Sequence, residues 1–227
     1  MGKKRKPRLP EEQSIFINEF YPRTSKQEKL IDLIETKEIV IATGSSGVGK
    51  TYVALATALS LLEQGYSKIC LIKSVTSISG EEIGFIPGTF EEKMEPYLMS
   101  YYGNIDKMCG KGTSKELVKK DLIEVLPIAY IRGLSIDDSI VIIDEAQNID
   151  RHTFKTIVTR IGSNSKYIFL GDVEQIDRKY KKESCLEEVL NIFKNSDIIG
   201  TVEFADEDCV RNPIIPKILE ELRKNNI

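Results

Sequence analysis

Residues 39–51 read IVIATGSSGVGKT, and this stretch decides the fold class of the chain. Its first half is a short β-branched run that predicts a buried strand. Gly44–Thr51 then matches the pattern G-x-x-x-x-G-K-[ST], and the Ala- and Leu-rich segment Thr51–Glu63 predicts a helix. A strand, this loop and a helix in succession are the context in which the pattern forms a phosphate-binding loop, or P-loop.

Each residue type in the P-loop has a physical reason. Glycines let the backbone turn with positive φ, so that successive N–H groups point inward and surround phosphate oxygens. The dipole of the following helix adds to the attraction for anions. Lys50 is expected to reach the β- and γ-phosphates, and the Thr51 hydroxyl to hold one position of a Mg²⁺ ion. The residues predicted to bind the nucleotide in this loop are Gly44, Ser45, Ser46, Gly47, Val48, Gly49, Lys50 and Thr51.

Two carboxylates follow a second apolar strand. Ile140–Ile143 is a run of four apolar residues, and Asp144 and Glu145 come directly after it. Ligands of open α/β sheets lie at the carboxyl ends of the strands, so Asp144 is expected to hold the Mg²⁺ shell. Glu145 would then orient or deprotonate an attacking water. An acidic residue at a strand end is also a common helix N-cap, and this alternative stays open.

Two amide side chains are further candidates for the same site. Gln175 follows the apolar strand Tyr167–Leu170 and a short turn, where it would contact a γ-phosphate oxygen and the attacking water. A plain strand-ending turn is the alternative. Gln27 stands at the start of the first predicted helix, and an amide can both accept from and donate to the edge of adenine. An ordinary capped helix start is the alternative there.

Short apolar runs and amphipathic segments alternate along the chain. The predicted strands are 38–42, 69–72, 123–126, 140–143, 167–170 and 198–202, and the predicted helices are 26–35, 51–63, 154–161, 186–193 and 215–223. This alternation predicts an α/β fold with a parallel sheet covered by helices on both faces. We expect one domain over residues 20–227, after a basic tail at residues 1–19. Ser74–Leu122 interrupts the alternation, and its length favours a functional insertion.

The composition limits the classes of function. The chain has 227 residues, with 32 Lys and Arg against 35 Asp and Glu, and its net charge of −3 gives no general attraction for nucleic acid. Its 4 cysteines are far apart and His152 is its single histidine, which disfavours a disulfide framework and a structural zinc site. No apolar run approaches the roughly 18 residues of a membrane span, and the basic N-terminus lacks the apolar core of a signal peptide. We therefore expect a cytoplasmic protein that does not bind membranes.

The motifs in this order resemble the PhoH-like family of P-loop ATPases, whose core is similar to the first motor domain of superfamily 1 helicases. The resemblance implies a P-loop NTPase (RecA-like) fold, and it extends beyond the nucleotide motifs. It runs from about residue 20 to residue 220 and includes Gly80–Gly88, Glu92–Met94, Pro96-Tyr97, Tyr130–Gly133, Asp144–Asn148, Thr159–Gly162 and Asp208–Asn212.

The resemblance implies roles for several residues. Gln27 would read adenine, and Arg160 or Arg211, with Arg211 favoured, would stabilise charge on the γ-phosphate as an arginine finger does. Lys50, Glu145 and Gln175 would complete the catalytic set for hydrolysis of ATP with Mg²⁺. The chain departs from the family pattern at Lys73-Ser74, where Arg-Pro is usual, and at Asn212, where His is usual. A contact that needs the planar fork of Arg is therefore in question at position 73.

Superfamily 1 helicases place ATP between two motor domains, whereas this sequence contains a single P-loop. We therefore expect a second subunit to complete the site. We expect a homo-oligomer, with a hexameric ring favoured, that acts on single-stranded RNA or DNA. A kinase for a small molecule and an assembly protein switched by the nucleotide are the alternatives. The candidates for contact with the nucleic acid are the lysines of the tail, Lys73, Lys93, Arg132, Tyr97, Tyr101 and Tyr102. Aromatic residues at this spacing more often pack in a core, so packing is favoured for the tyrosines, and the ATP site is the alternative for Arg132.

Overall fold

The computed structural model describes residues 20–73, 90–126, 128–131, 133, 135–176 and 184–225. Several features predicted from the sequence lie outside these residues, namely the basic tail at residues 1–19, the motif Gly80–Gly88 and Arg132. The side chains of residues 90–97, which include Lys93 and Tyr97, and the side chain of Lys73 are also outside the described part of the chain.

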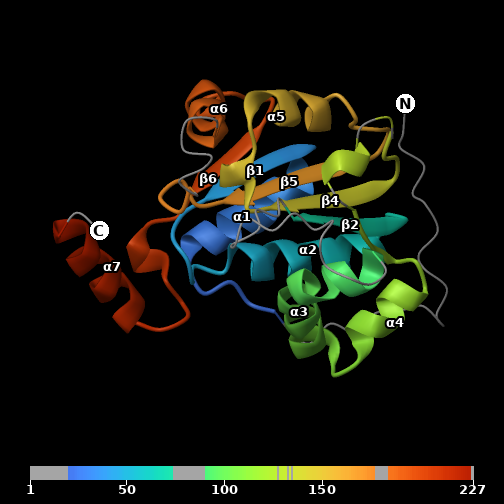
Figure 1. The fold of residues 1–227 in the computed structure, drawn as a ribbon, viewed down its shortest axis with the longest axis horizontal. Coiled ribbons are helices and arrows are strands. Elements are labelled where there is room, and N and C mark those ends of the chain that lie inside the picture. The colour runs from blue at the N-terminus through green and yellow to red at the C-terminus, as the bar shows by residue number, and fades with distance from the viewer. Residues whose placement is uncertain are drawn as a thin grey trace.

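Six parallel strands form a sheet at the centre of the described structure (Figure 1). In spatial order they are β3 (Ile123–Val125), β2 (Lys68–Lys73), β4 (Ser139–Asp144), β5 (Lys166–Gly171), β1 (Ile39–Thr43) and β6 (Gly200–Glu203). Each predicted strand is confirmed, with bounds that shift by at most two residues. The parallel α/β fold class is therefore the one that the alternation of apolar runs and helices predicted.

Seven α-helices connect or cover these strands in the described residues. They are α1 (Ser25–Thr36), α2 (Lys50–Glu63), α3 (Phe90–Cys109), α4 (Thr113–Lys119), α5 (Arg151–Val158), α6 (Leu186–Phe193) and α7 (Ile214–Lys224). Five of them confirm predicted helices, whereas α3 and α4 lie in the segment that was expected only to be an insertion. None of the described helices has the length and apolar character that a bilayer crossing requires.

The two faces of the sheet bury separate hydrophobic cores. Successive side chains of a strand point to opposite faces, so Ile140 and Ile142 of β4 enter one core while Val141 and Ile143 enter the other. The first core is closed by α1, α2, α3 and α4, and the second by α5 and α6. Figure 1 shows α5 and α6 above the sheet and α2, α3 and α4 below it.

Helix α2 is the most deeply buried helix of the layer below the sheet. Its buried residues surround the helix, as expected for a helix packed on more than one side, and they are Val53, Ala54, Leu55, Ala56, Thr57, Ala58, Leu59, Leu61 and Leu62. It contacts α1, α3 and strands of the sheet. Because the P-loop joins buried β1 to buried α2, both ends of the loop are anchored in the first core.

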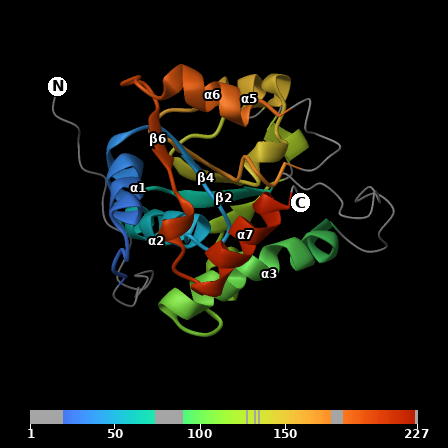
Figure 2. The ribbon, with the colours of Figure 1, turned by 90° about the vertical axis from the view of Figure 1, so that its left-hand side faces the viewer.

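Helix α7 lies outside both cores, at the carboxyl edge of the sheet. Figure 2 views the molecule from that side and shows α7 in front of the strands. None of its residues is buried. The guanidinium of Arg223 forms ion pairs with Glu174 (2.5 Å) and Asp206, which fasten the last turn of α7 to the segments that follow β5 and β6.

Candidate nucleotide-binding site

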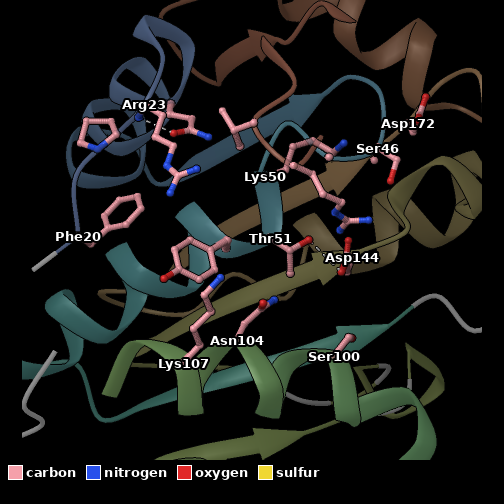
Figure 3. A pocket seen from close by; sticks show the side chains of 18 of the residues that line it. Phe20, Arg23, Ser46, Lys50, Thr51, Ser100, Asn104, Lys107, Asp144 and Asp172 are labelled. Atoms are coloured by element: carbon pink, nitrogen blue, oxygen red, sulfur yellow. Dashed lines mark hydrogen bonds between the residues drawn. The ribbon is translucent and has the colours of Figure 1, made fainter. Parts of the chain in front are cut away.

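A cavity of about 730 Å³ opens at the carboxyl edge of the sheet (Figure 3). Its volume is within the range of about 300–1,000 Å³ that is usual for small-molecule sites. Six regions of the chain line it: residues 20–27, the P-loop with the first turn of α2, α3, the end of β4, the end of β5, and the segment before α7. The carboxyl ends of parallel strands meet here, which is the position where the sequence placed the site.

The backbone of the P-loop depends on its glycines, and Gly44 and Gly49 show this most clearly. Gly44 and Gly49 have φ of 144° and 87°, in the region that residues with a side chain rarely adopt. A Cβ atom at Gly44 would lie 2.6 Å from Phe204, and one at Gly49 would lie 2.8 Å from Nε2 of Gln27. The loop is thus closely packed from outside, and its conformation leaves no room for side chains at these positions.

The ammonium group of Lys50 lies inside the P-loop. Its Nζ donates hydrogen bonds to the carbonyl oxygens of Gly44 (2.5 Å) and Ser45 (3.0 Å). Burial lowers the pKa of Lys50, while the carboxylates of Asp172 and Asp144 oppose that shift. Lys50 is therefore a partly desolvated cation between carboxylates, and it is placed to attract an anion that enters the loop.

The hydroxyl of Thr51 and the carboxylate of Asp144 meet at the floor of the cavity, as Figure 3 shows. Thr51 Oγ1 donates to Asp144 Oδ2 at 3.3 Å, and the hydroxyl of Tyr101 donates to the same oxygen at 3.0 Å. Burial raises the pKa of the Tyr101 hydroxyl well above its usual range, and the nearby Asp144 adds to the shift. The phenol is therefore a hydrogen-bond donor to this carboxylate at neutral pH.

These oxygen donors fit Mg²⁺ rather than a metal held by protein alone. Mg²⁺ is usually bound by one or two carboxylates together with phosphate oxygens and waters, which matches a single carboxylate and a hydroxyl next to a phosphate loop. No group of three or more His, Cys, Asp or Glu residues that could hold a metal occurs in the described part of the chain. The donor set at Thr51 and Asp144 thus suits an ion that arrives with a phosphate ligand.

Glu145 is held in place by a buried glutamine. Its backbone is left-handed, with φ 57° and ψ 38°, and its Oε2 accepts a hydrogen bond from Gln147 Nε2 at 2.7 Å. Oε1 of Gln147 accepts from the backbone N–H of Asp172 at 3.1 Å, and Gln147 is 2% exposed. Sequence reasoning assigned no role to Gln147, because nothing in a linear motif indicates that its amide spans β4 and β5.

The turn after β5 presents its polar groups to the same cavity. Asp172 and Gln175 both line it, and the N–H of Gln175 donates to the carbonyl oxygen of Asp172 at 3.1 Å. Burial raises the pKa of Asp172, while the N–H of Glu174 and the charge of Lys50 oppose the shift. Gln175 therefore lines the cavity, and it does so from the strand-ending turn that was the alternative interpretation of this segment.

Gln27 lines the cavity and also supports the P-loop. Its Nε2 donates to the carbonyl oxygen of Val48 at 2.8 Å, and its Oε1 accepts from the N–H of Arg23 at 2.8 Å. Its own N–H donates to the side chain of Thr24, so the capped helix start offered as the alternative is present. A pair of rings from Phe20 and Tyr52, with centroids 5.7 Å apart, lies at this end of the cavity.

The two candidate arginines lie at opposite ends of the strands, Arg211 at the carboxyl ends and Arg160 at the amino ends. Arg211 lines the cavity, and its neighbour Val210 donates an N–H to the carbonyl oxygen of Gly47 at 3.1 Å. The carbonyl oxygen of Arg160 instead accepts a hydrogen bond from the hydroxyl of Tyr167, at the start of β5, and another from the backbone N–H of Ile136, just before β4. A strand of six residues separates these ends by roughly 20 Å. Arg160 therefore does not reach the cavity of its own chain.

Helix α3 supplies cavity residues that sequence reasoning missed. Ser100, Asn104 and Lys107 line the cavity from one side of the helix, and Lys107 Nζ lies 5.9 Å from the ring centroid of Tyr52. Of the two roles considered for Tyr101, packing in the core is confirmed and stacking on nucleic acid is wrong, because its side chain is 1% exposed. Tyr102 is half-buried against the same core, which favours the packing alternative.

Comparison with known proteins agrees with the motifs. The family profile described as PhoH-like protein matches residues 19–223. The PhoH-like protein of Bacillus subtilis (strain 168) is 35% identical over 204 residues, which cover 90% of this chain and 64% of that protein. Protein PhoH of Escherichia coli (strain K12) is 32% identical over 200 residues, which cover 87% of this chain and 56% of that protein. The chain thus spans less than two thirds of the length of these relatives.

A solved structure extends the comparison to the fold. The large terminase from a thermophilic bacteriophage superposes with a TM-score of 0.52 and 12% sequence identity, over 88% of this chain and 50% of that one. At this identity the likeness shows the fold alone, which is that of a P-loop NTPase. The match of the family profile over residues 19–223 shows that this chain belongs to the PhoH-like protein family.

Proposed function

We propose that this chain binds ATP with Mg²⁺ in the cavity and hydrolyses the bond between the β- and γ-phosphates. The observation that carries the proposal is the 3.3 Å contact between Thr51 Oγ1 and Asp144 Oδ2. This contact joins the P-loop to the acidic end of β4 inside one cavity, which Lys50 and Glu145 also line. Phosphate-binding groups and a carboxylate for water activation thus lie within reach of one ligand.

The residues assigned to the reaction bind the phosphates and the ion or accept a proton. The N–H groups of the P-loop and the ammonium of Lys50 bind the phosphates, and Thr51 and Asp144 would hold Mg²⁺, which supplies positive charge to the phosphate oxygens when it is bound. Glu145, oriented by Gln147, accepts a proton from the attacking water.

Three further residues complete the proposed site. Gln175 orients the water, Arg211 stabilises negative charge that develops on the γ-phosphate, and Gln27 contacts the adenine edge while it holds Val48. Arg211 belongs to the same chain as the P-loop, so the arginine of the proposed site acts in cis.

We also propose that the chain works as a helicase-like motor on single-stranded RNA or DNA, in a hexameric ring. The support is the resemblance of the motifs to helicase-like ATPases, together with the single P-loop of this chain. The subunits of such a ring meet head to tail. Head-to-tail contacts of this kind close into rings when the rotation between subunits allows it.

The test is ATP hydrolysis by size-fractionated protein, measured as phosphate release with oligo-RNA, with oligo-DNA and with neither. Mg²⁺-dependent hydrolysis supports the ATPase, and stimulation by single strands supports the motor. Phosphate that appears on an acceptor molecule would replace the proposal with a kinase. Nucleotide-dependent assembly without stimulation would indicate a switch, and a fully active monomer would rule out the ring.

A pair of carboxylate variants tests the assignment of the general base. Glu145→Gln should still bind ATP but lose hydrolysis, because the amide cannot accept the proton. Glu203→Gln is the matched control, since Glu203 also ends a parallel strand but is exposed and pairs with Lys194 (3.2 Å). Normal turnover by Glu145→Gln would remove Glu145 from the mechanism.

A further inference from the structure

Both oxygens of the Asp144 carboxylate are held by hydrogen bonds from within the chain. Oδ1 accepts from the N–H of Glu145 at 3.0 Å. Oδ2 accepts from Thr51 at 3.3 Å and from the hydroxyl of Tyr101 at 3.0 Å. Two of these donors come from the nucleotide motifs themselves. The third comes from α3, which is separate from those motifs in the sequence.

Tyr101 approaches Asp144 from the core and not from the cavity. It belongs to the same buried core as Leu98, Ile105 and Met108, and the spacing of these four residues puts them on one side of α3. Ser100, on the other side of the helix, lines the cavity, as does Asp144, whereas Tyr101 is not among the described residues that line it. Its hydroxyl therefore orients the carboxylate without occupying the space that a ligand would fill.

We propose that Tyr101 is a positioning residue for Mg²⁺, through which α3 sets the affinity of the nucleotide site for the ion. The proposal rests on the proposed function, because it acts through the carboxylate assigned to Mg²⁺. Mg²⁺ requires nearly ideal octahedral geometry, so a ligand that rotates freely binds it less well. Hydrogen-bond partners behind a metal ligand typically contribute about 10–100-fold in metal affinity or activity.

The test is Tyr101→Phe, which removes the hydroxyl and keeps the ring. Binding of a fluorescent ATP analogue is titrated with Mg²⁺, and the half-saturating Mg²⁺ concentration is expected to rise about 10-fold. Binding of the analogue in EDTA should not change, and saturating Mg²⁺ should restore most of the hydrolysis rate. If the hydroxyl only stabilised the fold, binding in EDTA and binding with Mg²⁺ should weaken together.

Tyr167→Phe is the matched control. Tyr167 is also a fully buried tyrosine, and its hydroxyl donates to the carbonyl oxygen of Arg160 at 3.1 Å, at the opposite edge of the sheet. Both variants lose one hydrogen bond from a buried ring, but only Tyr101→Phe loses a bond to Asp144. The control should lower the melting temperature at most and leave the Mg²⁺ titration unchanged.

A double-mutant cycle distinguishes action through Asp144 from a general effect on the site. In an Asp144→Asn background, Tyr101→Phe should cause no further shift in the Mg²⁺ titration. An equal shift in both backgrounds, or an unchanged titration for Tyr101→Phe alone, would overturn the inference while leaving the proposed ATPase intact. Wild-type protein that binds the analogue equally well with Mg²⁺ and with EDTA would overturn the proposed function, and the inference with it.

Discussion

Two walls of the nucleotide cavity are built by different means. The P-loop wall is mainly backbone, with N–H groups directed by left-handed glycines and both ends anchored in buried β1 and α2. The α3 wall is made of side chains, in which Ser100, Asn104 and Lys107 face the cavity and Tyr101 reaches Asp144 from behind. Backbone groups suit the phosphates that all nucleoside triphosphates share. Side chains suit the features that differ, such as the base and the geometry of the ion.

The largest effect is expected from removing the side chain of Lys50, whose ammonium group is the cation of the P-loop wall. Lys50→Ala should reduce ATP hydrolysis by at least about 10²–10³-fold, since a preorganised group that stabilises transition-state charge contributes on this scale. The melting temperature should change little, because burial already disfavours the Lys50 ammonium.

Phosphate release and thermal unfolding together check this first prediction. Lys68→Ala is the control, because Lys68 pairs with Glu124 on β3 and does not line the cavity. Hydrolysis by Lys50→Ala within a few-fold of wild type would mean that this wall does not bind the reacting phosphate.

One glycine from each wall gives the second prediction, and the two should respond with opposite sign. Gly49→Ala places a Cβ atom 2.8 Å from Gln27 Nε2 at a φ of 87°, so it should destabilise the protein by about 1–2 kcal/mol and abolish most nucleotide binding. Gly103 lies in α3, and a Cβ atom there would meet none of the described residues within 4 Å. Gly103→Ala should therefore stabilise the protein by about 0.5–1 kcal/mol.

Chemical denaturation and nucleotide titration measure both glycine variants. Equal effects of the two substitutions would contradict the difference between a wall made of constrained backbone and one made of a regular helix.

The third prediction is a smaller effect at the far end of the α3 wall. Lys107 lies over the ring of Tyr52, and an exposed cation above an aromatic ring contributes about 0.5–1 kcal/mol. Because Lys107 and Tyr52 both line the cavity, loss of a contact of this size should weaken binding of the fluorescent ATP analogue by at most about 2–5-fold and leave the Mg²⁺ requirement unchanged. Lys115→Ala, on neighbouring α4 and away from the cavity lining, is the control. A shifted Mg²⁺ titration for Lys107→Ala would mean that the two ends of α3 do not act separately.

The sequence predicts the two walls to very different extents. The P-loop wall follows from a local pattern, because glycines, a β-branched strand and an Ala-rich helix each specify their own backbone. Helix α3 was missed because Pro96 and Gly103 are helix breakers by propensity. Tertiary packing of Tyr101 and Ile105 in the first core overrides that weak preference.

Side-chain roles that depend on long-range contacts were the hardest to predict. The sequence favoured Arg211 over Arg160 only through the family resemblance, since it is the direction of the intervening strands that places Arg211 at the cavity and Arg160 at the opposite ends of the strands. Packing was the favoured interpretation of Tyr101, but the hydrogen bond from its hydroxyl to Asp144 was not predicted. Its partner is 43 residues away in the chain, and no spacing rule connects the two.

The smallest effect is expected outside both walls, where Arg223 fastens α7 to Asp206 and Glu174. Exposed ion pairs contribute about 0.2–1 kcal/mol, so Arg223→Ala should lower the free energy of unfolding by no more than this at pH 7. The Arg223 guanidinium holds the pKa of Asp206 below its usual value of 3.8. A lowered carboxyl pKa stabilises the fold above the unfolded value and ceases to do so as the pH falls through the folded value.

The difference in the free energy of unfolding between wild type and Arg223→Ala should therefore be full above about pH 4 and shrink below it. Urea denaturation between pH 7 and pH 3 measures it, and added salt should reduce it at pH 7 by screening the exposed charges. Lys224→Ala is the control, because Lys224 pairs only within α7, with Glu220 and Glu221, in the described residues. A large loss that is independent of pH would mean that α7 is held by apolar packing and not by its charges.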